Sequence, residues 1–267
     1  MSTPTLPIAL TIAGSDSGGG AGIQADLKTF HGFGVFGTSA VTAITAQNTL
    51  GVSAVHPIPV DVVQAQIDAV AQDLRPTGVK TGMLATVPLV EAVARSLDEH
   101  QLANYVLDPV MVSSTGARLL AQEAEGAVAQ LLVPRSALVT PNLHEAAILT
   151  GLEVETEEDQ REAARALVAA GAGAALVKGG HGSGDSVFDF FWDGKEEREW
   201  RRPRIDTRHT HGTGCTLSAA IAAGLAAGQS LESAVDAGLS FVARAITTAP
   251  GLGQGNGPLD FFVQAHP

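Results

Sequence analysis

The chain has 267 residues and a formal net charge of −12, from 28 acidic and 16 basic side chains. This acidic balance argues against a nucleic-acid or anionic-membrane surface, which requires a basic face. The single cysteine excludes a disulfide framework and zinc sites of the CxxC type. Hydrophobic residues make up 45% of the chain and charged residues 16%, so we expect a folded protein with a sizeable core.

In chain order, the hydrophobic pattern predicts strand 8–13, helix 21–31, strands 38–45 and 52–58, helix 60–74, strand 78–81, helix 87–99, strands 105–108 and 137–140, helices 143–150 and 157–170, strand 174–178, a hairpin of 186–192 and 196–200, and helices 213–227 and 231–248. Alternating strands and helices are typical of a mostly parallel sheet with helices on both faces. We predict an α/β fold, a three-layer α/β/α sandwich, as one domain over 1–267.

The sequence also predicts a cytoplasmic protein. The first basic residue is Lys28, so the apolar stretch 6–13 lacks the positively charged region of a secretory signal. The weakly polar stretch 215–228 is shorter than the roughly 20 apolar residues that cross a bilayer.

Two apparent motifs favour structural interpretations. The GxGxxG at 32–37 follows a predicted helix and precedes a strand, the reverse of the dinucleotide-binding arrangement, so it indicates a helix-ending turn. His209 and His211 could be metal ligands, but their alternate spacing fits no ordinary helical zinc site and favours loop or surface roles. The chain has no GxxxxGK[ST] run, so any nucleotide chemistry does not use a P-loop.

The strongest functional signal is the run HGTGCT at 211–216, which leads into an alanine-rich helix. Glycine lets backbone N–H groups converge on a ligand, and a helix N-terminus adds unpaired donors and partial positive charge. Together they predict an anion hole suited to phosphate. Cys215 would lie in the first helical turn, where a thiolate is favoured and its pKa is lowered. The alternative is an ordinary helix start with a small buried cysteine.

A second glycine-rich loop, 14–22, has five glycines in nine residues and follows the first predicted strand. Close backbone approach to a ligand explains this density, with a flexible connector as the alternative. Asp26 lies about one turn into the next helix. It could accept hydrogen bonds from a ring amine or a hydroxyl, or it could be an exposed helical carboxylate.

Polar residues also lie at the end of, or just after, three other predicted strands. Asn142 and Glu145 are three apart and so share a helix face, where they could hold Mg²⁺ through oxygen ligands. Asp108 could add a second oxygen, and Lys178 could neutralise nucleotide phosphate. Each residue alone could equally serve in capping or solvation, but their shared location at strand ends favours a site.

Basic residues are concentrated in the hairpin and loop before the anion hole, where acidic residues alternate with them. This mixture favours a solvated strand face. The six basic residues are Lys195, Arg198, Arg201, Arg202, Arg204 and Arg208.

Seven sequence blocks occur in one order along the chain: AGSDSGGGAGIQADLKTF, ITAQNTLGV, TGMLA, VLDPVM, TPNLHEA, VKGGH and THGTGCTLSAA. Through these ordered blocks the chain closely resembles the hydroxymethylpyrimidine/phosphomethylpyrimidine kinases of thiamine biosynthesis, which belong to the ribokinase-like superfamily. The resemblance runs from about residue 8 to 248. The GxGC block, with cysteine where related sugar kinases have aspartate, is specific to this branch.

The resemblance implies a single ribokinase-like α/β/α domain that is generally dimeric. It implies a kinase that uses ATP and Mg²⁺ to phosphorylate the hydroxymethyl group of a small-molecule pyrimidine and then phosphorylates that monophosphate again. No nucleic acid or membrane partner is expected.

The same resemblance assigns roles by motif match. The aminopyrimidine would be surrounded by Gly14, Asp26, Gln47, Met83 and Val110. The reaction would depend on Cys215 as candidate base near the substrate hydroxyl, or as a group that only positions it, with an anion hole of Gly212, Thr213 and Gly214. Mg²⁺ and phosphate charge would be handled by Asp108 and Glu145, and the nucleotide side would hold Asn142, Lys178 and Thr210.

One segment departs from the family pattern. After VLDPVM the family often has Lys or Thr followed by Ser-Gly-Asp, whereas this chain has SSTGA at 113–117, a segment that we predict to be a lid. Two alternative functions remain open at this point. One is a pyridoxal or pyridoxine kinase, whose substrate also carries a hydroxymethyl group on a nitrogen heteroaromatic ring. The other is a non-catalytic pyrimidine-binding regulator.

Overall fold

The computed structural model describes residues 6–111, 119–180 and 184–265, so the predicted lid at 113–117 lies outside the described residues. Its elements in chain order are β1 (Ile8–Asp16), α1 (Gly22–Gly32), β2 (Phe36–Asn48), β3 (Gly51–Pro57), α2 (Val60–Asp73), β4 (Gly78–Thr81), α3 (Val87–Glu99), β5 (Tyr105–Leu107), α4 (Gln122–Ala127), η1 (Val128–Leu132), η2 (Val133–Arg135), β6 (Leu138–Val139), α5 (Leu143–Thr150), α6 (Glu157–Ala169), β7 (Ala175–Lys178), β8 (Ser186–Trp192), β9 (Glu197–Pro203), α7 (Thr213–Ala226) and α8 (Leu231–Thr247).

The strands form one sheet in the order β3-β2-β1-β4-β5-β6-β7-β8-β9. From β2 to β7 every neighbouring pair is parallel, whereas β3 at one edge and β8 and β9 at the other are antiparallel. The mostly parallel sheet predicted from the sequence is therefore confirmed. Because parallel strands end at the same edge, the loops after β1, β4, β5, β6 and β7 all leave the sheet on one side.

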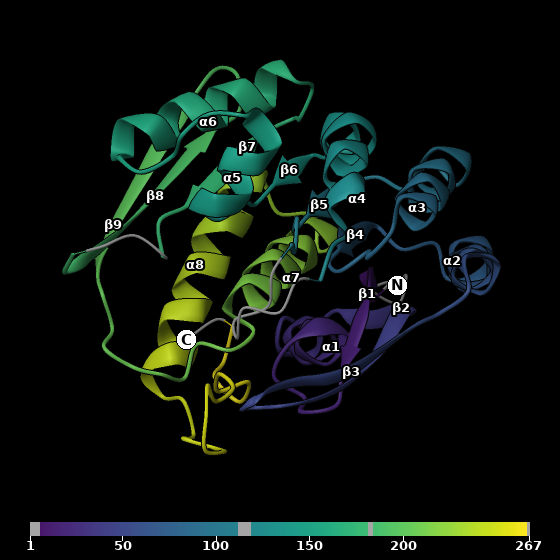
Figure 1. Ribbon diagram of the computed structural model, residues 1–267, viewed down its shortest axis with the longest axis horizontal. Helices are drawn as coiled ribbons and strands as arrows, with labels where there is room; N and C mark the ends of the chain where they lie inside the picture. The colour runs from purple at the N-terminus through teal and green to yellow at the C-terminus, as the bar shows by residue number, and fades with distance from the viewer. Residues whose placement is uncertain (1–5, 112–118, 181–183, 266–267) are drawn as a thin grey trace, which may run out of the picture.

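Helices cover both faces of the sheet (Figure 1), as predicted. The series α2 to α6 packs on one face, and α1, α7 and α8 pack on the other. Side chains of one strand alternate between the two cores. On β5, Val106 packs with Phe30 of α1 and Ile221 of α7, whereas its neighbours Tyr105 and Leu107 belong to the opposite core. This burial on both faces explains the continuous apolar runs of the central strands.

Two predictions are wrong at the level of elements. β1 continues to Asp16, where the sequence predicts that the glycine loop has already begun. The cause is pairing with β2, in which Asp16 is the partner of Thr45 beyond a bulge. β2 is itself longer than predicted. The stretch 122–135, to which the pattern assigns no element, forms α4 and two short helical turns. The GxGxxG at 32–37 is the helix-ending turn that the sequence favours, with Gly34 at a φ of +72°.

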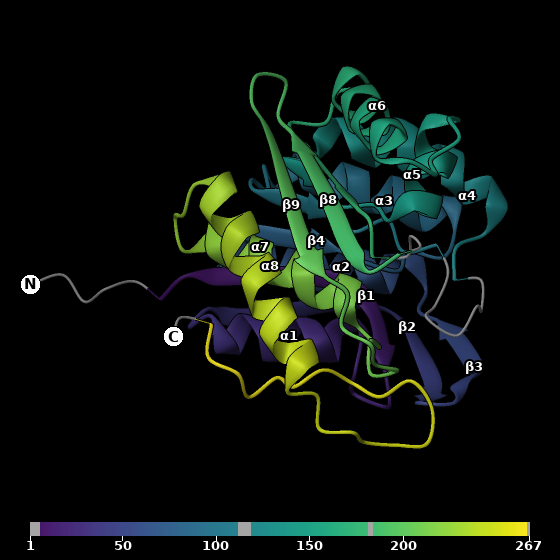
Figure 2. The ribbon, with the colours of Figure 1, turned by 90° about the vertical axis from the view of Figure 1, so that its left-hand side faces the viewer.

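The β8–β9 hairpin extends along α6 and α8 (Figure 2), and its basic residues pair with acidic ones. Arg198 bonds Glu232 of α8 and Arg201 bonds Glu157 of α6. Their side chains are 39% and 51% exposed, in agreement with the predicted solvated face. Arg202 differs, because its partner on β8 is a buried carboxylate. In the described part of the chain, no helix is long and apolar enough to cross a membrane.

The packing of β4 against α7 leads to a stability prediction. A Cβ on Gly78 would lie 2.5 Å from the Ala222 carbonyl oxygen and 2.9 Å from the Ala226 Cβ. We expect Gly78→Ala to lower the free energy of unfolding by about 1–3 kcal/mol through overpacking. The matched control is Gly126→Ala in α4, where an added Cβ meets nothing within 4 Å. The free energy of unfolding of that variant, measured with denaturant, should rise by about 0.5–1 kcal/mol. Equal effects of the two substitutions would contradict the packing account.

Candidate active site

The two glycine-rich loops that the sequence predicts separately lie in direct backbone contact. Gly212 precedes α7 with a φ of +85°, in the left-handed region that favours glycine. A Cβ on Gly212 would lie 1.8 Å from the Gly20 carbonyl oxygen, so no larger residue fits while the loops stay together. A Cβ on Gly20 would lie 2.7 Å from Cδ2 of His211. The start of α7 is thus pressed against the loop that follows β1.

The carboxylate of Asp16 ties these two loops together. Its Oδ1 accepts a hydrogen bond from Gly18 N at 2.8 Å, and its Oδ2 accepts from Gly20 N at 3.0 Å and Ala21 N at 2.9 Å. His211 Nε2 also lies 2.9 Å from Oδ2. Burial raises the pKa of Asp16, but the hydrogen bonds from His211 and the backbone outweigh it and hold the pKa below its ordinary value. His211 therefore has the loop role that the sequence favours, although its side chain is buried.

Cys215 lies in the first turn of α7, as predicted, and faces the start of a second helix. The backbone N–H of Gly22, the first residue of α1, lowers the pKa of its thiol, so the thiol lies beside that helix start. Gly22 has a φ of +55°, and a Cβ there would lie 2.3 Å from the Gly14 carbonyl oxygen. Only glycine at this position lets α1 begin so close to the end of β1. The thiol thus lies where two helix N-termini meet.

The predicted lowering of the Cys215 pKa is wrong. Burial raises the pKa of the thiol to about 11. The Lys80 ammonium and the Gly22 N–H lower it, but the negative charges of Asp26 and Asp108 act in the other direction. The sequence reveals the helix start but not how far the packing around it buries the thiol. A pKa near 11 favours the neutral thiol at neutral pH.

Asp26 is fully buried, so the exposed helical carboxylate that the sequence left open is excluded. Lys80 Nζ lies 3.0 Å from its Oδ1 and 2.9 Å from its Oδ2, and the Thr11 hydroxyl donates to Oδ2 at 2.6 Å. Thr11 and Lys80 are register partners on β1 and β4. Sequence reasoning missed Lys80, although a lysine inside the buried run GVKT is a usable signal. The hydrogen bond between Asp26 and a substrate stays a prediction.

The other residues that the resemblance assigns to the substrate lie at the same end of the sheet. A Cβ on Gly14 would lie 3.2 Å from Met83 Sδ, so the ends of β1 and β4 are in contact there. Gln47 Nε2 lies 3.2 Å from His211 Nε2, and Gln47 lines an open hollow of about 540 Å³ beside β3. Val110 follows β5, two residues beyond Asp108.

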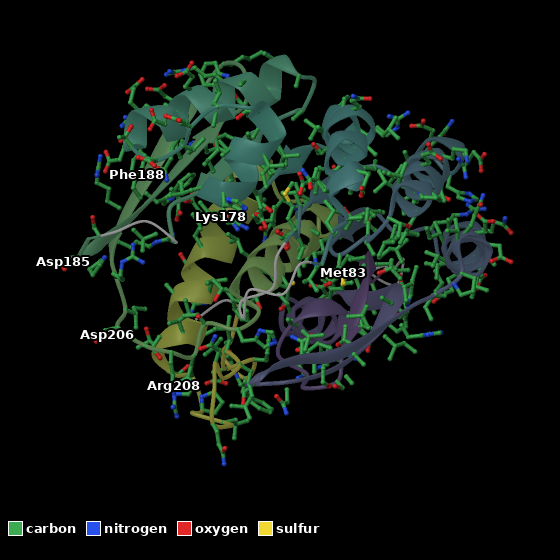
Figure 3. All side chains as sticks on the ribbon, viewed as in Figure 1. Met83, Lys178, Asp185, Phe188, Asp206 and Arg208 are labelled. Carbon is green, nitrogen blue, oxygen red and sulfur yellow. The ribbon has the colours of Figure 1, made fainter. Side chains whose placement is uncertain are left out.

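Asp108 and Lys178 come together beside the anion hole. Lys178 ends β7, and its Nζ lies 3.5 Å from Asp108 Oδ1. A Cβ on Gly214 would lie 3.5 Å from Lys178 Nζ and 3.8 Å from both Asp108 carboxylate oxygens. Figure 3 shows Lys178 and Met83 in the middle of the view, whereas Asp206 and Arg208 lie at its edge. Sequence reasoning missed Ser218, one turn into α7, whose hydroxyl donates to Asp108 Oδ2 at 3.1 Å.

Asn142 and Glu145 form a capping box at the start of α5. Glu145 N donates to Asn142 Oδ1 at 2.9 Å, and Asn142 N donates to Glu145 Oε2 at 2.8 Å. The prediction that both side chains share a helix face is therefore wrong, because Asn142 precedes the helix as its N-cap. Burial raises the pKa of Glu145 to about 7, with Lys178 lowering it and Asp108 raising it.

The chemistry of these donors fits a magnesium ion bound together with phosphate. Asp108 and Glu145 are both buried carboxylates that interact with Lys178. Mg²⁺ is commonly held by one or two carboxylates, with phosphate oxygens and water as its other ligands. Among the described residues, no group of three or more His, Cys, Asp or Glu side chains could hold a metal by itself.

Thr210 and Thr213 shape the backbone at the start of α7. The carbonyl of Thr210 accepts two hydrogen bonds from Thr213, one from the backbone N–H at 3.2 Å and one from the side-chain hydroxyl at 2.7 Å. Thr210 itself is exposed. Its contact with a nucleotide stays a prediction.

The family model of the phosphomethylpyrimidine kinases matches residues 16–260. The chain belongs to this family. It is 49% identical to the hydroxymethylpyrimidine/phosphomethylpyrimidine kinase of Bacillus subtilis, over 96% of this chain and 94% of that one. It is also 47% identical to the thiamine biosynthesis bifunctional protein ThiED of Geobacter sulfurreducens, over 96% of this chain and 52% of the relative. The protein is therefore a kinase.

The structure is also similar to a solved one, a Bacillus subtilis pyridoxal kinase in complex with ADP. The TM-score is 0.90 at 40% identity, over 96% of this chain and 98% of the other. The fold is thus the ribokinase-like one that the sequence predicts.

The raised pKa of Cys215 predicts how this kinase reacts with iodoacetamide. A thiol with a pKa near 11 is protonated at neutral pH, and its reactive thiolate fraction grows as pH rises toward the pKa. The alkylation rate of the ligand-free enzyme should rise about tenfold per unit between about pH 7 and 9. Since Cys215 is the only cysteine, mass spectrometry of the intact chain measures this rate directly. A rate that levels off by about pH 8 would mean a lowered pKa.

Proposed function

We propose that the enzyme transfers the γ-phosphoryl group of ATP to the hydroxymethyl oxygen of 4-amino-5-hydroxymethyl-2-methylpyrimidine. It then phosphorylates the monophosphate to the diphosphate, as a step of thiamine biosynthesis. The observation that carries this proposal is the position of Cys215. The thiol lies at the meeting point of two helix N-termini, in the same loop as Gly214, which faces Lys178 and Asp108.

Phosphoryl transfer requires in-line positioning and neutralisation of charge more than covalent chemistry. The substrate oxygen forms a bond to the γ-phosphorus while the bond to the β-phosphate oxygen breaks and ADP leaves. The backbone N–H groups of Gly212–Cys215 would stabilise negative charge on the moving phosphoryl group. Lys178 would offset charge on the nucleotide side. When bound, Mg²⁺ reduces the negative charge of the ATP phosphates, and Asp108 and Glu145 would hold it.

Cys215 would orient the substrate hydroxyl. Its raised pKa argues against a thiolate that waits to remove the proton. The hydroxyl proton can leave late in a loose transition state, because little negative charge is needed on the attacking oxygen, and it can pass to an oxygen of the transferred phosphoryl group or to water. The thiol would therefore hold the hydroxyl in line with the γ-phosphorus through a hydrogen bond.

Pyridoxal kinase activity is the second candidate, and the high structural similarity to a pyridoxal kinase favours it. Both substrates carry a hydroxymethyl group on a nitrogen heteroaromatic ring. Gln47 and Met83 favour the pyrimidine through the family resemblance. ATP consumption should be measured with the pyrimidine, its monophosphate and pyridoxal, with products identified by phosphorus NMR. Consumption that depends on pyridoxal alone would replace the proposed substrate, and none with any substrate would favour a non-catalytic regulator.

The homodimer and the cytoplasmic location remain predictions. Apolar side chains exposed along β2 and β3 support the homodimer, since such groups are commonly covered by a partner. They include Ile44 at 52% exposure and Val55 at 43%.

Replacing Cys215 separates positioning from proton removal. Cys215→Ala should leave pyrimidine affinity by calorimetry within about threefold and lower kcat by about 10²–10⁴. Cys215→Ser keeps a hydrogen-bonding group and should retain at least about tenfold more activity than the alanine variant. If serine and alanine are equally inactive, Cys215 acts as a base. Unchanged turnover in Cys215→Ala would remove this residue from the mechanism.

A further inference from the structure

The β8–β9 hairpin carries the basic cluster that the proposed function leaves unused, and part of it reaches the nucleotide side of the site. Asp189 on β8 is the register partner of Lys178 on β7. Its carboxylate is buried, although the hairpin lies at the edge of the sheet. A buried carboxylate requires partners that satisfy its oxygens.

Each oxygen of Asp189 has a specific partner. Oδ1 accepts a hydrogen bond from the backbone N–H of Gly179 at 2.9 Å, and Oδ2 pairs with the Arg202 guanidinium. A Cβ on Gly179 would lie 2.0 Å from the Phe188 carbonyl oxygen, so the backbone after Lys178 approaches β8 too closely for a side chain. Burial raises the pKa of Asp189, and Arg202, the Gly179 N–H and Lys178 lower it.

The backbone of Lys178 is therefore fixed on both sides. Toward α5, its N–H donates to the Pro141 carbonyl at 2.9 Å. Toward the hairpin, its successor Gly179 is held by Asp189. The side chain then extends to Asp108, with Nζ at 3.5 Å from Oδ1. A small shift of Gly179 would move the ammonium relative to the anion hole.

Arg204, directly after β9, holds the backbone that follows Gly179. Its NH1 donates to the Gly180 carbonyl at 2.7 Å, and its Nε donates to the Gly184 carbonyl at 2.8 Å. One planar guanidinium thus bonds two carbonyl groups that are four residues apart. The bond to Gly180 thus ties the backbone just after Gly179 to the end of β9.

We propose that Asp189 and Arg204 are positioning residues for nucleotide binding, which they control by fixing the backbone after Lys178. Neither side chain needs to touch ATP. The inference rests on the proposed placement of Lys178 against the nucleotide phosphates, but not on the identity of the phosphorylated ring. Groups that orient a binding residue commonly affect affinity by about 10–100-fold.

The test is calorimetric binding of ADP in the presence of MgCl₂ to the full-length enzyme. Asp189→Ala and Arg204→Ala should each raise the Kd for ADP by about tenfold or more. Asp189→Asn keeps an acceptor for the Gly179 N–H and should bind ADP within about threefold of the unaltered enzyme. In steady-state assays Asp189→Ala and Arg204→Ala should raise KM for ATP and leave KM for the second substrate unchanged.

The matched control is Arg198→Gln, on the same hairpin. It removes the bond to Glu232 of α8 and leaves the backbone after Lys178 untouched, so the Kd for ADP should not change. Binding stoichiometry reports the folded fraction separately from affinity. A merely structural role would lower the stoichiometry and leave the Kd of the folded fraction as it was.

A parallel measurement on Lys178→Met separates two claims: that Lys178 contacts the nucleotide phosphates, and that Asp189 and Arg204 position it. If Lys178→Met binds ADP as tightly as the unaltered enzyme, the placement of Lys178 fails, and the inference built on it fails too. If Lys178→Met weakens ADP binding while Asp189→Ala or Arg204→Ala stays within about twofold, the placement stands and the positioning role is overturned.

Discussion

The contact between Gly20 and Gly212 is the constraint on which the rest of the site depends. Two loops, from opposite ends of the chain, meet with no space for a side chain between them, because a Cβ on Gly212 would lie 1.8 Å from the Gly20 carbonyl oxygen. This contact brings the start of α7 to the start of α1, and Cys215 lies where they meet. Asp16 and His211 then hold the two loops in that arrangement.

The net charge of −12 does not describe the electrostatics of this site. The buried Lys80, the half-buried Lys178 and the two helix N-termini place positive charge around the thiol and the anion hole. Each lysine is paired with a carboxylate, so neither ammonium group is an unpaired charge inside the protein. Local positive charges and N–H donors thus make phosphate binding possible, although the overall acidic composition argues against it.

Sequence patterns predict most of this fold, because they are local. Apolar periodicity gives nearly every strand and helix, and the glycine runs at 14–22 and 211–216 indicate the two loops of the site. The extension of β1 to Asp16 could not be predicted, because it depends on pairing with β2. The capping box of Asn142 and Glu145 uses the same side chains as a metal-binding pair would, so the spacing alone does not separate the two.

The direction of the Cys215 pKa shift shows a second limit of prediction from the sequence. A helix start lowers a thiol pKa, and the sequence reveals that feature. Burial of the thiol acts in the opposite direction and has the larger effect on its pKa, but it depends on how α1 and α7 pack. Lys80 was missed for the same reason, since its partner Asp26 is 54 residues away in the chain.

The most direct test of this account is the turnover of Gly212→Ala compared with Gly228→Ala. Both glycines have a positive φ, of +85° and +81°, but a Cβ on Gly228 meets nothing within 4 Å. Backbone strain is therefore common to both variants, and only Gly212→Ala separates the loops. We expect kcat to fall about 100-fold or more in Gly212→Ala, because displaced groups no longer align with the phosphoryl group. Gly228→Ala should stay within about threefold of the unaltered enzyme. Equal turnover in the two variants would contradict the central role of the loop contact.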